Sequence, residues 1–94
     1  MRRIIILGST SRGHNGYFPV NPTRGVHNVR IGSRPVVIEG TPYFSHTRRD
    51  SPWHTGYAIA KSKVYTRRGR IQLEGDPNTC GDTASNGYRR VLAR

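Results

Sequence analysis

The amino-acid sequence predicts a small all-β domain built of β-hairpins, with little or no helix. Three observations lead to this class: short β-branched runs end at glycines, turn-forming residues are frequent, and no apolar run is long enough for a buried helix. The 94 residues include 11 Gly and 6 Pro, and only 33% of them are hydrophobic. Glycine and proline at this density favour turns and disfavour long helices.

The β-branched runs are copies of one phrase. The copies are Arg3-Ile4-Ile5-Ile6-Leu7-Gly8, Val36-Val37-Ile38-Glu39-Gly40 and Ile71-Gln72-Leu73-Glu74-Gly75. A second phrase, His14-Asn15-Gly16-Tyr17, returns as His54-Thr55-Gly56-Tyr57 and, without its histidine, as Asn86-Gly87-Tyr88. Repeated units pack on one another because a single unit cannot bury its own apolar face. The sequence therefore predicts three units around a shared axis, with approximate threefold symmetry.

The repeats define the expected elements of a single domain over residues 1–94. Hairpin repeats are predicted at about 26–42 and 61–77, with turns at 32–35 and 67–69. The third repeat is split between residues 1–8 and 88–94, so the two termini should pair side by side. This pairing would close the set of hairpins without an open edge strand. Residues 9–24 and the segment from Pro42 to Tyr57 are expected to be loops.

A bound metal ion is the cross-link that we expect to stabilise this small core. A chain of this length buries a thin core, and its one cysteine excludes an internal disulfide. His14 and His54 precede Gly-Tyr in the second phrase, while His46 and Cys80 follow the run-ending glycines by six and five residues. Threefold packing would bring these four residues to one loop-rich end. Three imidazoles and one thiolate match the tetrahedral preference of Zn²⁺, so we expect one structural zinc per chain.

The fourth histidine and the cysteine also suggest roles outside a metal site. His27 lies within a predicted strand and is expected to be a strand or surface residue, not a ligand. Cys80 with a neighbouring histidine and Asp82 resembles an activated nucleophile. However, no phosphate-binding glycine loop and no isolated carboxylate pair is present, so we expect no enzymatic activity, no catalytic residue and no organic cofactor site.

The charge of the chain leaves a second function open. The formal net charge is +11, from 14 Arg and 2 Lys against five acids. The basic residues are spread in pairs along the chain, which is typical of a solvated surface. A small zinc-stabilised basic module that binds nucleic acid would carry the same excess of charge. No apolar run is long enough for a signal peptide or a transmembrane segment, so we expect synthesis in the cytoplasm without either.

The repeats and the four candidate ligands together resemble a known family, the PAAR-repeat proteins. The similarity covers nearly the whole chain and rests on the hairpin copies, the Gly13-His14 loop, His46, His54-Thr55-Gly56 and Cys80-Gly81-Asp82-Thr83. The Pro-Ala-Ala-Arg signature itself is replaced by Arg34-Pro35-Val36-Val37. The resemblance implies a small cone of β-hairpins with a metal site near the apex, in which His14, His46, His54 and Cys80 bind Zn²⁺.

The resemblance also implies a mechanical function. Members of the family form the membrane-piercing tip that caps and sharpens the trimeric β-helical spike of contractile injection machines, with one monomer per spike and transient contact with the target-cell membrane. The expected location is the tip of a phage tail baseplate, or the cytoplasm until ejection by a type VI secretion system. The sequence leaves open which of these machines is involved, which spike protein is the partner, whether an effector is attached, and whether the metal is zinc or iron.

Overall fold

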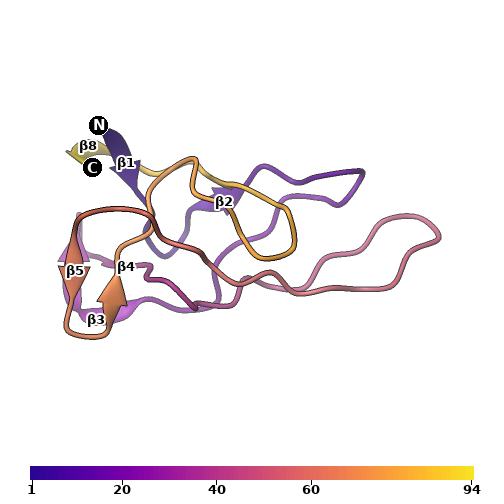
Figure 1. Cartoon of the computed structure of the whole chain (residues 1–94), viewed down its shortest axis with the longest axis horizontal. Helices are drawn as coiled ribbons and strands as arrows, with labels where there is room; N and C mark the ends of the chain where they lie inside the picture. The colour runs from indigo at the N-terminus through magenta and orange to yellow at the C-terminus, as the bar shows by residue number, and fades with distance from the viewer.

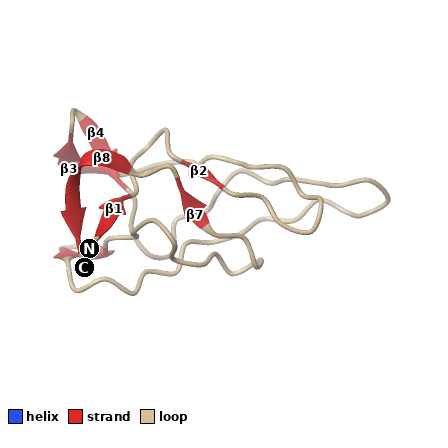
Figure 2. Cartoon of the chain, turned by 90° about the horizontal axis from the view of Figure 1, so that it is seen from above, coloured by secondary structure: helices blue, strands red, loops and turns tan.

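The computed structural model describes all 94 residues as eight short β-strands joined by loops, with no helix. The all-β prediction is confirmed. The strands are β1 (Arg2–Ile4), β2 (Thr10–Ser11), β3 (Val26–Ile31), β4 (Arg34–Val36), β5 (Tyr65–Thr66), β6 (Gly69–Arg70), β7 (Ala84–Ser85) and β8 (Tyr88–Ala93). The molecule measures 39 × 22 × 22 Å. Most strands gather at one end with the two termini, and loops extend to the other end (Figures 1 and 2).

Three hairpin-like pairs form this strand-rich end. β3 pairs with β4 and β5 pairs with β6, both antiparallel, as the two predicted hairpins require. β1 pairs with β8, which confirms that the two ends of the chain lie side by side. The regular strands are shorter than predicted: β4 ends at Val36, and Ile38 makes only an isolated bridge to Ile71. The prediction of loop over 9–24 misses β2, which pairs with β7.

The three copies of the repeated run bond to one another in a closed ring. The Ile5 amide donates to the Gln72 carbonyl at 3.0 Å, Gln72 donates to Val37 at 2.9 Å, and Val37 donates back to Ile5 at 3.0 Å. Each of these residues stands three places before the glycine that ends its run, and each is fully buried. Buried backbone groups must find partners, and here each run satisfies the next one. No copy is complete without the other two.

Two apolar clusters lie on either side of this ring. The cluster that includes the paired strands contains Ile4, Val26, Val36, Ile71, Leu73 and Ala93. The cluster that supports the loops contains Ile5, Val20, Val37, Tyr43, Ala58 and Ala84. The two sets alternate along the first two runs because extended backbone has a period of two, and in the third run the polar Gln72 stands between Ile71 and Leu73. The second cluster fixes the loops from which the candidate site is built.

The glycine that ends each run redirects the chain from the ring into a loop. Gly8, Gly40 and Gly75 have φ values of 104°, 82° and 93°, a region that side chains other than glycine rarely adopt. The residue after each glycine donates its amide to the carbonyl three places back, as Thr41 does to Ile38 at 3.2 Å. The three outgoing loops therefore start from the same turn.

Candidate metal centre

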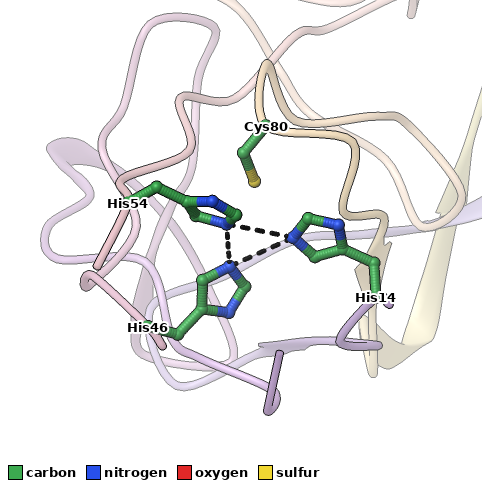
Figure 3. A group of neighbouring side chains, drawn as sticks. All are labelled: His14, His46, His54 and Cys80. Atoms are coloured by element: carbon green, nitrogen blue, oxygen red, sulfur yellow. Dashed lines mark hydrogen bonds between the residues drawn. The ribbon is translucent and has the colours of Figure 1, made fainter. Parts of the chain in front are cut away.

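Four side chains from different loops meet near one point. The nitrogen or sulfur atoms of His14, His46, His54 and Cys80 all lie within 4.8 Å of one another. Figure 3 shows the three imidazole rings turned edge to edge, with the thiol above them. His46 is buried, and the other three are partly buried. The structure thus brings together all four residues that the sequence selected, and the group could hold one metal ion.

Two of the three spacings between the histidine nitrogens are close to those of a tetrahedral metal site, and the third is shorter. The Nε2 atoms of the three histidines are 2.6, 3.1 and 3.2 Å apart. Ligands placed about 2.0–2.1 Å from a metal at tetrahedral angles would be about 3.3–3.4 Å apart. Three imidazole nitrogens facing one another at these distances repel unless a proton or a cation lies between them. The donor set and its geometry therefore fit a small tetrahedral cation.

A hydrogen bond fixes the ring of His46 on the side that faces away from the other two histidines. Its Nδ1 lies 2.7 Å from the carbonyl oxygen of Phe18. A carbonyl oxygen only accepts, so Nδ1 carries the proton and Nε2 of the neutral ring presents its lone pair. Such a bond from the distal nitrogen is the usual orienting contact of a metal-binding histidine.

Asp82 is a member of the site that sequence reasoning placed in a different role. Its side chain is fully buried, and its Oδ1 accepts from the Thr83 amide at 2.7 Å. Oδ2 has no hydrogen-bond partner and lies 4.0 Å from Nδ1 of His46. The sequence suggested Asp82 only as a helper of a nucleophilic cysteine. In the structure this carboxylate is an outer neighbour of the buried histidine.

The register of the second repeated phrase was predicted incorrectly. His14 bridges to Tyr17, and His46 bridges to His54, each by two backbone hydrogen bonds. His14 and His46 are therefore equivalent, and Tyr17 takes the place that His54 holds in the next loop. His14 had been aligned with His54 because both precede Gly-Tyr, although His14 follows Gly8 by the same six residues that separate His46 from Gly40. Both histidines still reach the cluster.

Tyr17 closes one side of the cluster by stacking. Its ring lies 4.0 Å from that of His54 and 5.0 Å from that of His14, at interplanar angles of 24° and 17°. The guanidinium group of Arg48 lies over the Tyr17 ring, with its Cζ atom 4.8 Å from the ring centroid. Partial desolvation, followed by the neighbouring His46 and His14, lowers the pKa of His54 below its ordinary value. Desolvation and these neighbours therefore favour the neutral, metal-binding form of the His54 ring.

Gly56 provides the space for the thiol. A Cβ atom at this position would lie 2.5 Å from Sγ of Cys80 and 3.3 Å from Cβ of Asn78. The backbone conformation of Gly56 is one that other residues can adopt, so the requirement for glycine here is one of space alone. Gly56 belongs to the repeated His54-Thr55-Gly56-Tyr57 in the sequence, which gives no sign of this steric role.

The fourth histidine of the chain lies outside the cluster. His27 is an exposed residue of β3, as the sequence predicted. The structure contains no helix that could span a membrane.

Fold and site together define a small all-β domain with a closed set of three histidines and one cysteine. No protein-family model matches the chain, and no curated protein matches it.

Proposed function

We propose that this protein is a PAAR-like spike tip, a structural part that caps and sharpens the trimeric central spike of a contractile injection machine. The observation that carries the proposal is the cyclic bonding of the three runs through Ile5, Val37 and Gln72. Three similar edges around one axis allow a monomer to match the threefold end of a trimer. The proposal needs no catalytic step.

The two ends of the molecule suit different tasks in this proposal. The end that holds β1, β3, β5, β8 and both termini would form the base that contacts the spike (Figure 1). Its exposed apolar side chains include Leu92, Val91 and Tyr65. A stable joint requires about 800 Å² on each partner, which is within reach of a base of this size. The loops with the candidate metal centre would form the leading end, which makes transient contact with a target membrane.

Zinc is the ion that the donor set favours. Three imidazole nitrogens and one thiolate are borderline ligands in a closed tetrahedral set, with no position left for water or substrate. His14, His46, His54 and Cys80 would hold the ion, which would supply cross-linking and no reaction chemistry. The ion would tie together three loops, and structural zinc contributes on the order of 10 kcal/mol to the folding of small domains. It would thereby keep the leading end closed under force.

The proposal is tested by binding to a trimeric β-helical spike protein of a contractile machine. We expect one chain per spike trimer by analytical ultracentrifugation. Leu92→Asp, at the base, should abolish the complex, whereas the matched change Phe44→Asp in the loop that carries His46 should leave it intact. Binding to none of a panel of phage and type VI spikes, or equal loss in both variants, would contradict the proposal.

Salt dependence separates this function from the alternative of a basic nucleic-acid module, which the net charge of +11 favours. Binding to nucleic acid should fall steeply between about 50 and 200 mM salt, because neutralised phosphates release counterions. Capping through strand ends and apolar contacts should change little over this range. Strong salt-sensitive binding to DNA, with no spike partner, would favour the alternative.

A further inference from the structure

The three clefts between neighbouring hairpin pairs are not alike, and one of them is open. β1–β8 and β3–β4 share the same bulged register, in which Ile4 pairs with Tyr88 and Val36 pairs with Val26. Tyr88 and Val26 are therefore equivalent positions, one large and one small. The two side chains are therefore expected to point into equivalent clefts, and the smaller one leaves more of its cleft unfilled.

Tyr88 fills the cleft next to the β3–β4 turn. Its ring lies against Gly32, where a Cβ atom would approach the Tyr88 ring to 2.3 Å. The equivalent cleft lies between β3 and the β5–β6 turn, and there the smaller Val26 leaves space. Two adjoining cavities of about 420 and 410 Å³ occupy this cleft and share Val26, Asn28 and Arg68 as walls. Their size is that of a small-molecule site.

The walls of this cleft are strongly basic. Arg24 stands on the β3 side, while Arg67 and Arg68 stand on the β5–β6 turn opposite. None of these three arginines takes part in an ion pair within the chain. The cleft contains one acid, Glu39, whose Oε2 accepts from the Arg70 amide at 2.7 Å. Three unpaired cations therefore face a cavity with a single carboxylate that is already bonded.

Guanidinium groups at this density recognise phosphate oxygens by paired hydrogen bonds as well as by charge. We propose that the cleft between β3 and the β5–β6 turn binds a small anion that carries two or more phosphate groups, through Arg24, Arg67 and Arg68. Asn28 would add a neutral donor at the boundary of the two cavities. The proposal does not depend on the metal, because none of the cleft residues belongs to the candidate metal centre. The cleft lies at the end proposed to contact the spike, so anion binding is measured on the free chain.

Isothermal titration with sodium tripolyphosphate at about 150 mM salt tests the site. We expect saturable binding of one anion per chain, at least tenfold weaker in the double variant Arg24→Gln/Arg68→Gln. Arg89→Gln/Arg90→Gln on β8 removes the same charge outside the cleft and should change the Kd less than twofold. All variants alter exposed side chains, so folding is checked by comparing their melting temperatures.

A third variant separates a shaped site from general charge attraction. Asn28→Phe fills the shared wall of the cavities without changing the net charge, and we expect it to weaken binding at least fivefold. The absence of saturable binding in the natural chain, equal weakening by the two arginine double variants, or unchanged binding by Asn28→Phe would each overturn the proposal.

Discussion

His46 and His54 are joined by two backbone hydrogen bonds of 3.1 Å, and their Nε2 atoms lie 2.6 Å apart. The bridge places the two rings 4.5 Å apart between centroids, at an interplanar angle of 60°. A site that is already formed in the folded chain, and absent from the unfolded chain, links binding energy to folding energy. The first prediction follows from this link.

Removing the buried ligand should destabilise the whole domain. We expect His46→Ala to lower the free energy of unfolding of the metal-loaded protein by more than about 3 kcal/mol, because it opens the ligand set and leaves the Phe18 carbonyl unpaired. The matched control is His27→Ala, an exposed histidine of β3, which should change stability by less than about 0.5 kcal/mol. Thermal and urea unfolding measure both. Similar effects of the two changes would argue against a structural role for the cluster.

Asp82 should tune the affinity of the site through His46. Asp82→Asn replaces the unpaired Oδ2, 4.0 Å from Nδ1 of His46, with either an amide donor or a weaker acceptor. Loss of an outer carboxylate typically weakens metal affinity by about 10–100-fold, and we expect a change in this range. Competition with a chromophoric zinc chelator measures it. The same substitution at the exposed Asp50 should leave the affinity unaltered, and an equal loss there would refute the role of Asp82.

Gln72 should be required for a polar network inside the core. The Tyr43 hydroxyl donates to its Oε1 at 2.7 Å, and its Nε2 donates to Oδ1 of Asn78 at 3.0 Å. The equivalent residues of the ring, Ile5 and Val37, are apolar. We expect Gln72→Val to cost about 1–3 kcal/mol, because two buried polar groups lose their partner.

A double-mutant cycle tests whether the network, and not volume alone, carries this cost. Tyr43→Phe removes one of the two orphaned groups, so Gln72→Val should cost less in that background than in the natural chain. Denaturant unfolding of the four proteins gives the coupling energy. Strictly additive effects would show that the hydrogen bond makes no net contribution.

Tyr43 should also set the alkaline limit of stability. Burial, and then the charges of Asp82 and Asp76, raise the pKa of its hydroxyl well above the ordinary value of 10.0. Above pH 10 the unfolded chain releases this proton while the folded chain retains it, so stability present below pH 10 is lost as pH rises. The slope is about 1.4 kcal/mol per pH unit. The free energy of unfolding of Tyr43→Phe should fall less steeply with pH, by this amount. Identical pH profiles of the two proteins would contradict the role of Tyr43.

Much of the fold could be predicted because the repeat is written in short apolar runs. The three glycine-ended runs indicated three packed units, and the split third copy predicted the pairing of β1 with β8. The sequence did not predict β2 and β7, whose two residues each are too short for an alternating pattern. It also did not predict the ring of hydrogen bonds, since backbone partners depend on how the units are placed in space.

The four cluster residues were identified for a partly incorrect reason. Their residue types and the single cysteine pointed to a metal, which did not require an exact alignment. The alignment of His14 with His54 was wrong, because Tyr17 holds the equivalent place in the first loop. Asp82, Gly56 and the open cleft beside Val26 became visible only with side-chain positions, since each depends on a neighbour distant in sequence.

Elemental mass spectrometry of protein purified without a metal-binding tag measures directly whether the chain holds a structural zinc. We expect one tightly bound zinc per chain in the natural protein, and much less than one in Cys80→Ser and in His46→Ala. Melting in the presence of a strong chelator should then match that of the variants. A natural chain without bound metal, and with a melting temperature that does not respond to chelator or added zinc, would contradict this expectation.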